Sequence, residues 1–254
     1  MRILLTNDDG INAPGLEVLE SIAATLSDDV WVVAPEIDNS GASHSLSLND
    51  PLRLREIGER RFAVKGTPTD CVIMGVRQVL LDNPPDLVLS GVNRGQNIAD
   101  DVTYSGTIAG AFEGAVLGIR SIALSQGYFY DQDKPVPWET ARKYGPGIVS
   151  RLLPQMKNAD VVMNINFPAC DPDEVEGVEV TRQGKRDQSL FYLDRRVDGR
   201  NNPYYWMAFS RIRSNPPLGT DLRASYDRRI SITPLMLDMT HHESLDPLAQ
   251  ALRE

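Results

Sequence analysis

Two adjacent carboxylates follow the first apolar run of the chain. Asp8 and Asp9 come directly after Arg2–Asn7 (RILLTN) and are followed by Gly10. In an extended strand the two side chains would point to opposite faces, but at a turn that contains glycine both can aim at one point. Two carboxylates placed in this way repel each other unless a cation lies between them. The tripeptide alone fits a divalent-metal site and a turn or helix-capping element about equally well.

Two further polar loops favour the metal interpretation. They are residues 38–45 (DNSGASHS) and 90–97 (SGVNRGQN), and each follows a predicted buried strand. In an open α/β sheet, ligands bind beyond the carboxyl ends of the strands, so we expect both loops to lie beside the two carboxylates. Mg²⁺ and Mn²⁺ prefer oxygen ligands in octahedral array. Ser40 and Asn93 can supply such neutral oxygens.

An anion-binding site is predicted at Tyr104–Thr107 (YSGT), directly before a long helical segment. The N–H groups at a helix start have no partner inside the helix, and they bind anions well. Ser105 and Thr107 add hydroxyl groups there, and Gly106 leaves space for a ligand. Taken alone, Ser105 would be interpreted as an ordinary N-cap.

Several enzyme classes lack their sequence signatures here. The chain contains no G-x-G-x-x-G, no G-x-x-x-x-G-K-[ST] and no G-x-S-x-G, so dinucleotide sites, P-loops and nucleophile elbows are not predicted. His44 lies in the second polar loop, where a catalytic role and a hydrogen-bonding role are equally compatible with the sequence. His241 and His242 lie in a polar segment and are expected to be solvated.

The amino-acid composition limits the partners that the protein can bind and the compartment in which it can work. The 254 residues carry a net charge of −9, which argues against binding to nucleic-acid polymers or anionic membranes. Residues 1–125 hold 9 Lys/Arg against 17 Asp/Glu, so phosphate bound there would need a metal or oriented backbone dipoles. Apolar runs are too short for a transmembrane helix, and no secretory signal is expected. The chain has only two cysteines, Cys71 and Cys170. This small number excludes a disulfide scaffold and favours a location in the cytoplasm.

The segments that must position these residues alternate between strand and helix patterns. Strands are expected at residues 2–7, 29–34, 86–90, 121–125 and 161–167, with a hairpin at 52–65. Helices are expected at residues 14–26, 67–80, 107–118 and 138–153. This order predicts a doubly wound, mostly parallel sheet in a three-layer α/β/α arrangement. Glycine recurs every four residues at 106, 110, 114 and 118, which predicts close packing of that helix on the sheet.

The character of the chain changes after Pro168. Charged, aromatic-rich strands are expected at residues 175–183, 189–195 and 203–213, and a last strand and helix at 229–234 and 246–252. Arginine and lysine among residues 182–200 are interpreted as a solvated strand face. We therefore expect residues 1–170 to form the catalytic α/β core. Residues 171–254 are expected to form a β-rich arm and oligomerisation region whose final strand and helix return to the core.

Several ordered motifs resemble the SurE family, the survival-protein nucleotidases. They are Met1–Gly15 (MRILLTNDDGINAPG), Pro35–Ser45, Gly66–Cys71 (GTPTDC), Ser90–Asn97 and Tyr104–Gly114, with Gly219–Asp221 and Ile230–Thr240 nearer the C-terminus. Residues 126–215 are the least similar stretch. The resemblance implies a Rossmann-like core and a divalent-metal-dependent phosphatase, of the 5′-nucleotidase class, for nucleoside 5′- and 3′-monophosphates. Some members of the family also cleave polyphosphate.

The resemblance also assigns residues to roles. Its metal ligands correspond to Asp8, Asp9, Ser40 and Asn93, with the two aspartates as the catalytic pair. Its phosphate contacts correspond to Asn97, Ser105, Gly106 and Thr107. It further implies a homodimer or homotetramer with exchanged C-terminal elements.

Two alternatives remain open. An aspartyl-phosphate phosphatase of the haloacid-dehalogenase type would carry D-x-D after its first strand, whereas the carboxylates here are adjacent. A non-catalytic nucleotide-binding module would bind ligand tightly without metal-dependent turnover.

Overall fold

The first strand occupies the middle of the sheet. In the computed structural model, which describes residues 1–129, 134–186, 191–209 and 215–253, β1 (Arg2–Thr6) lies between β2 (Asp29–Pro35) and β5 (Leu87–Arg94). It runs parallel to both, and its apolar residues are buried on both faces, as expected for a central strand. The mixed α/β class with a mostly parallel sheet, predicted from the sequence, is confirmed.

The large sheet contains nine strands in the order β3-β4-β2-β1-β5-β6-β7-β11-β8. Its remaining strands are β3 (Arg53–Gly58), β4 (Arg61–Lys65), β6 (Arg120–Gln126), β7 (Val161–Phe167), β8 (Gly177–Val180) and β11 (Arg229–Met236). The six strands from β4 to β7 run parallel to one another, while β3 pairs antiparallel with β4 and β11 antiparallel with β7. All carboxyl ends of the parallel strands therefore meet at one edge.

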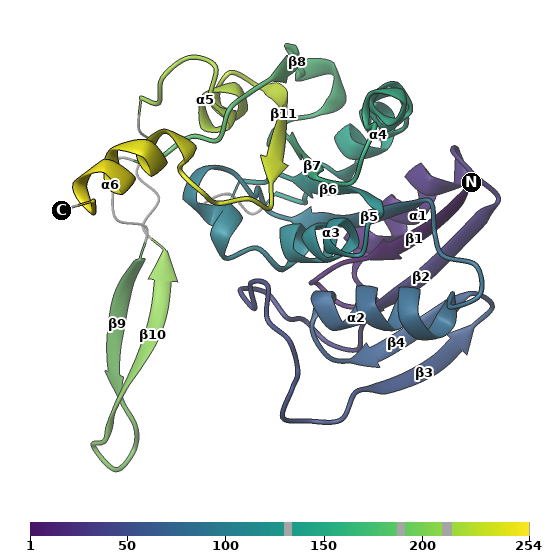
Figure 1. Cartoon of the computed structure of the whole chain (residues 1–254). Coiled ribbons are helices and arrows are strands. Elements are labelled where there is room, and N and C mark those ends of the chain that lie inside the picture. Colours follow the sequence, from purple (N-terminus) through teal and green to yellow (C-terminus); the bar gives the residue numbers. More distant parts are fainter. Residues whose placement is uncertain (130–133, 187–190, 210–214, 254) are drawn as a thin grey trace.

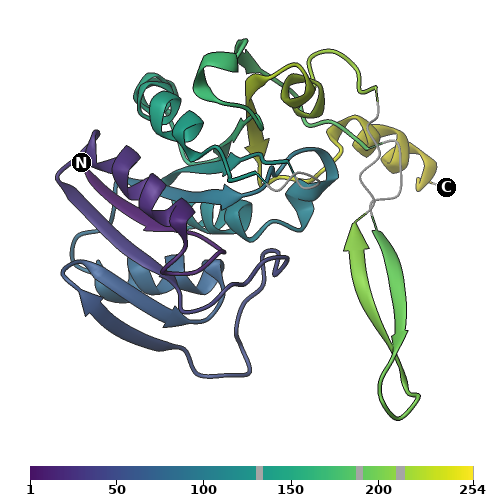
Figure 2. The same cartoon turned by 180° about the vertical axis from the view of Figure 1, so that it is seen from behind.

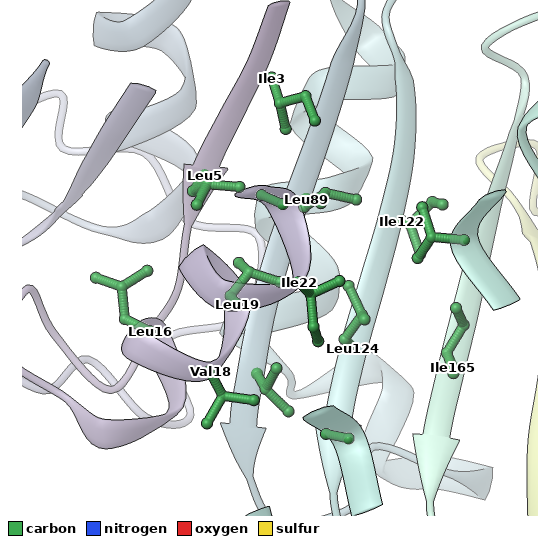
Figure 3. Close-up of a cluster of buried hydrophobic side chains, with 14 of the residues drawn as sticks. Ile3, Leu5, Leu16, Val18, Leu19, Ile22, Leu89, Ile122, Leu124 and Ile165 are labelled. Carbon is green, nitrogen blue, oxygen red and sulfur yellow. The ribbon is translucent and has the colours of Figure 1, made fainter. Parts of the chain in front are cut away.

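Helices cover both faces of this sheet (Figures 1 and 2). On one face α1 (Pro14–Ala24) packs beside α4 (Trp138–Leu152), and on the other α2 (Pro68–Met74) packs beside α3 (Gly106–Val116). Figure 3 shows the first of these cores, where Leu19 and Ile22 of α1 lie over the strands that carry Leu5 and Leu89. Alternate residues of the same strands face α2, which gives the three-layer arrangement.

Helix α3 lies unusually close to the strands. A Cβ at Gly110 would come within 2.9 Å of Thr6 Cγ2 and Ser90 Oγ, and one at Gly114 within 2.3 Å of Ser121 Oγ. The predicted packing of the glycine-rich face on the sheet is thus confirmed at these positions. Gly118 differs, because it has a φ of +81° and follows the end of the helix, a usual position for glycine.

Two local predictions need correction, and one short helix was missed. The strand expected to end at Ser90 continues to Arg94, because pairing with β6 resumes at Asn93 after an irregularity. At that irregularity Gly91 has a φ of +137°, and a Cβ there would lie 2.2 Å from the carbonyl oxygen of Leu124. The helix expected to reach Leu80 is an α-helix only to Met74 and then a π-helix over Gly75–Val79. The short helix α5 (Asp221–Tyr226) was not predicted.

The C-terminal part of the chain is divided between the large sheet and a projecting hairpin. Strands β8 and β11 lie at one edge of the large sheet, whereas β9 (Phe191–Val197) and β10 (Pro203–Phe209) form a separate antiparallel pair. This pair extends away from the body of the molecule (Figure 1). Residues 189–190 and 210–213 of the predicted strands lie outside the described residues.

The described chain closes with α6 (Leu245–Ala251). Among the described residues, none of the helices combines the length and the apolar character needed to cross a bilayer.

Candidate metal and phosphate site

Asp8 and Asp9 lie in a tight turn at the carboxyl end of β1. The side-chain amide of Asn7 donates to the carbonyl oxygen of Gly10 at 2.8 Å and closes this turn, in which Gly10 has a φ of +100°. Asp8 is only 4% exposed, and its Oδ1 accepts a hydrogen bond from the Thr107 hydroxyl at 2.5 Å. The turn therefore directs one carboxylate toward α3.

The surroundings of this turn disfavour the ionised forms of both carboxyl groups. Burial and, second, the neighbouring Asp9 carboxylate raise the pKa of Asp8 from 3.8 to about 7. Burial also raises the pKa of Asp9, although its carboxylate accepts a hydrogen bond from the backbone N–H of Arg94 at 3.0 Å. Asp38 adds further negative charge near both groups. A bound cation would neutralise this charge and favour both ionised forms.

The loop after β2 is attached to the same turn. The backbone N–H of Asn39 donates to the carbonyl oxygen of Asp8 at 2.8 Å. The carboxylate of Asp38 accepts from the N–H of Ser40 at 2.7 Å, and Ser40 is exposed. The structure thus brings Ser40 to the edge occupied by the two aspartates.

Asn93 reaches the site from β5. It precedes Arg94, whose N–H binds Asp9, and its side-chain NH₂ donates to the carbonyl oxygen of Gly95 at 3.0 Å. This bond uses the NH₂ group, so the amide oxygen is the group left for a cation.

The donor set fits a hard divalent cation. It consists of two carboxylates, one hydroxyl and one amide oxygen, which are the oxygen ligands that Mg²⁺ and Mn²⁺ prefer. In the described part of the chain, no three His, Cys, Asp or Glu side chains gather as metal ligands. A cation held here would therefore depend on the neutral oxygens as well as on Asp8 and Asp9.

The N-terminus of α3 faces the same carboxylate. Ser105 is its N-cap, and its Oγ accepts from the N–H of Ile108 at 3.0 Å. A Cβ at Gly106 would lie 2.8 Å from Cβ of Asp8, so only glycine allows the helix start to approach this closely. The first N–H groups of α3 thus point to a region beside Asp8, where they can bind an anion.

The hydroxyl of Thr107 has a partner that the sequence did not indicate. It was expected to face phosphate, but it is fully buried and donates to Asp8. A hydroxyl has one proton to donate, so Thr107 orients the carboxylate through its side chain and can bind an anion through its backbone N–H.

Asn97 lies at the same edge and is 7% exposed. Its side-chain NH₂ donates to Ser125 Oγ at 2.9 Å, and its backbone is held by Asn164 and Asn166 of β7. These two asparagines were not among the predicted residues. Their signal in the sequence was present, because polar residues at alternate positions interrupt the buried strand VVMNINF.

His44 has a hydrogen-bonding partner on α3. Its Nε2 lies 3.0 Å from Oε2 of the buried Glu113. Glu113 is seven residues beyond Gly106, which places this pair about 10 Å along the helix from the anion-binding end. Between the two roles left open by the sequence, the geometry favours hydrogen bonding. His241 and His242 are exposed, as expected.

Comparison with known proteins identifies relatives along the whole chain. The family model described as "Survival protein SurE" matches residues 3–190. The "5'-nucleotidase SurE" of Methylorubrum extorquens (strain PA1) is 61% identical over 253 residues and is covered completely in both chains. The protein of the same name from Parvibaculum lavamentivorans is 60% identical over 252 residues, covering 99% of this chain and 91% of that protein.

The solved structures give the same result. The crystal structure of the SurE protein from Aquifex aeolicus superposes with a TM-score of 0.85 at 38% sequence identity, covering 99% of each chain. Sequence and fold therefore agree over the full length, and the chain belongs to the SurE family.

Proposed function

We propose that this chain hydrolyses nucleoside 5′-monophosphates to nucleoside and phosphate, using one divalent cation per subunit. Full-length relatives at about 60% identity bear the name 5'-nucleotidase SurE, which supports the reaction class. The observation that carries the site is the adjacent pair Asp8, which is buried, and Asp9, which is half-buried, with Asp8 beside the N-terminus of α3. The proposal extends to 3′-monophosphates and polyphosphate, which present the same terminal phosphoryl group.

The proposed cation is Mg²⁺ or Mn²⁺, and its ligands are Asp8, Asp9, Ser40 and Asn93. When bound, such a cation would polarise a phosphoryl oxygen and lower the pKa of water toward neutrality. Thr107 holds the Asp8 carboxylate in place through its hydroxyl. The hydrogen bond from the Arg94 N–H orients Asp9 in the same way.

The proposed phosphate contacts lie at the start of α3, next to Asp8. The first N–H groups of α3, at Gly106 and Thr107, point toward the anion together with the positive end of the helix dipole. Ser105 accepts a hydrogen bond as N-cap, and this leaves its own proton free to donate to a phosphate oxygen. Asn97 supplies an amide group. Donors of this kind act most strongly on charge that develops in the transition state.

The test is phosphate release from a panel of substrates. Nucleoside 5′- and 3′-monophosphates and polyphosphate are incubated with Mn²⁺, Mg²⁺ or a chelator. We expect release from 5′-monophosphates that depends on the added cation and is abolished by the chelator. Undiminished release in the chelator would refute the metal-dependent mechanism, and tight nucleotide binding without any release would favour the non-catalytic module.

The same assay separates the aspartyl-phosphate alternative. That class needs a second aspartate two positions after the first, and the residue two after Asp8 is Gly10. We therefore expect no burst of covalent phosphoenzyme when the reaction is quenched with acid. Recovery of a phosphorylated Asp8 peptide would contradict this expectation.

We also propose that the protein acts in the cytoplasm as a homodimer or homotetramer. Its two cysteines, Cys71 and Cys170, are buried free thiols, which suits a reducing compartment. The projecting hairpin exposes Tyr205 and Trp206 by 54% and 59%. An isolated two-stranded hairpin is marginally stable at best, so a second subunit that covers it would stabilise it.

A further inference from the structure

We propose that two buried side chains, Asn166 and Asp221, are positioning residues for the segment Asn97–Asp101. This segment begins at Asn97 and leads into the loop before α3, so its course determines how the Asn97 amide reaches a phosphate. The inference rests on the proposed function of that site, and it concerns residues that make no direct contact with substrate.

Asn166 fixes the backbone of Asn97 from β7. Its Oδ1 accepts from the N–H of Asn97 at 2.8 Å, while its NH₂ lies 3.2 Å from the carbonyl oxygen of the same residue. Asn164 donates to that carbonyl at 2.8 Å, and its own Oδ1 accepts from Asn166 at 3.1 Å. Both asparagines are buried. Both polar groups of the Asn97 backbone are therefore held by side chains from a strand far along the sequence.

Asp221 fixes the next part of the segment from the N-terminus of α5. It is fully buried, and its carboxylate accepts from the N–H groups of Ala99 at 2.9 Å, Gly184 at 2.8 Å and Leu222 at 2.7 Å. Burial raises the pKa of this carboxyl, and the three N–H donors oppose that shift. One carboxylate thus joins three separate stretches of chain.

The conformation held by Asp221 is an unfavourable one. Ala99 has a φ of +53°, in the left-handed region that residues with a Cβ rarely adopt. Its carbonyl oxygen is also held, by the side-chain NH₂ of Gln183 at 2.8 Å. Without these bonds we expect the segment to relax toward an ordinary backbone conformation, because the two hydrogen bonds offset much of the strain at Ala99.

A role in catalysis follows from where this strain is held. Strained backbone that is held by buried polar side chains is typical of functional sites. If stability were the only requirement, buried apolar residues of similar size would serve equally well. Relaxation of residues 97–101 would shift the Asn97 amide, but it would leave in place the turn at Asp8 and Asp9 and the Thr107 hydroxyl that holds Asp8. We therefore expect phosphate binding and turnover to depend on the two positioning residues, and metal binding to be independent of them.

The test compares variants that keep the shape of each side chain. Asn166→Asp loses the donor to the Asn97 carbonyl, and Asp221→Asn places an NH₂ among three N–H donors. With AMP and Mn²⁺ we expect kcat/KM to fall roughly ten- to a hundred-fold, the size of effect produced by small misplacements. Calorimetry should show weaker binding of inorganic phosphate to the Mn²⁺-loaded protein and unchanged affinity for Mn²⁺ itself.

The matched control is Thr233→Val. Thr233 is the cross-strand neighbour of Asn164, and its buried hydroxyl lies 2.8 Å from that of Thr181, with which it forms a hydrogen bond. The Thr233→Val variant should lower Tm as the test variants do, but kcat/KM and phosphate affinity should be unchanged. If the three variants lose activity only in proportion to Tm, the positioning role is refuted.

A milder variant keeps the proposal testable if the buried substitutions prevent folding. Gln183 is exposed, so Gln183→Ala should fold and show a smaller loss of kcat/KM in the same direction. No loss in this variant would count against the proposal. If the parent protein itself released no phosphate from AMP, the proposed function would fail. The phosphate-binding measurement would still decide whether Asn166 and Asp221 position the anion site.

Discussion

Asp8 links the stability of the metal-free protein to pH. Its pKa is about 7 in the folded protein and ordinarily 3.8, so between these values the folded state holds a proton that the unfolded state has released. The free energy of unfolding therefore falls as pH rises from about 4 to about 7, by about 4 kcal/mol in all.

This decline can be measured by urea unfolding in the presence of a chelator. Between about pH 5.5 and pH 7.5 we expect a loss of about 2 kcal/mol. Asp8→Asn has no carboxyl to titrate and should show a much flatter profile over the same range. Equal slopes in the parent and the variant would show that Asp8 does not carry the shifted pKa.

The aspartates should also control metal binding. We expect Asp8→Asn and Asp9→Asn to fold but to lose Mn²⁺ binding and turnover, because each loses a charged oxygen ligand. Each substitution also relieves the repulsion between the two carboxylates, so the metal-free variants should be more stable than the metal-free parent. Calorimetry with Mn²⁺ and thermal melts test both points. Undiminished Mn²⁺-dependent hydrolysis by Asp9→Asn would contradict the ligand assignment.

Thr107 connects the two halves of the site. Its hydrogen bond lowers the pKa of Asp8, so Thr107→Val should raise that pKa further. We expect kcat/KM to fall roughly ten- to a thousand-fold, as for loss of a donor at a charged centre. Mn²⁺ affinity should fall at pH 6, where the cation must displace a more tightly held proton from Asp8, and recover at pH 8.5. A loss of affinity that is equal at both pH values would argue against this link.

The start of α3 depends on close approach to β1. Gly106→Ala would place a Cβ 2.8 Å from Cβ of Asp8, a separation that real Cβ atoms do not adopt, so either the helix start or the turn must shift. We expect a large loss of phosphate affinity and kcat/KM together with a lower Tm.

The control for this element is a glycine in another helix. At the exposed Gly147 of α4, the nearest atom to an added Cβ is the end of the Arg151 side chain at 3.8 Å. Gly147→Ala should stabilise the protein by about 0.5–1 kcal/mol with no change in activity. If Gly106→Ala behaved in the same way, the close approach would have no functional meaning.

Assembly and activity should be linked through the hairpin. Arg186 precedes the hairpin in the sequence and contacts the segment Asn97–Asp101. Its guanidinium lies 2.5 Å from a carboxylate oxygen of Asp101, and its N–H donates to Asp100 at 2.7 Å. We expect deletion of residues 189–213 to give monomers or aggregates with impaired turnover, because both the proposed subunit contact and the support at Arg186 are disturbed.

Light scattering and nucleotidase assays on the same samples test this prediction. Trp206→Glu is the finer variant, because it places a charge on the exposed face of β10 without removing the hairpin. It should weaken assembly while leaving the Arg186–Asp101 ion pair intact. A deletion variant with the size and activity of the parent would show that the hairpin is dispensable for both.

The sequence by itself determined the layers of the molecule and the sheet edge at which the candidate site lies. Strands and helices follow from local periodicity, and β7 begins and ends at the predicted residues, Val161 and Phe167. Because parallel strands end at one edge of a sheet, polar residues after three of them were sufficient to predict that Asp8, Asp9, Ser40 and Asn93 lie together. The glycine repeat in α3 likewise predicted its packing on the sheet.

Only the tertiary structure decided which buried groups meet across long stretches of sequence. Asp221 binds the backbone of Ala99, 122 positions earlier, and Asn166 binds that of Asn97, 69 positions earlier. The Thr107 hydroxyl turns to Asp8, and β8 joins the large sheet beside β11. No local pattern encodes these pairs. Each forms because folding removes water from both partners, so that a buried polar group must bind whichever complementary group the packing of distant elements places beside it.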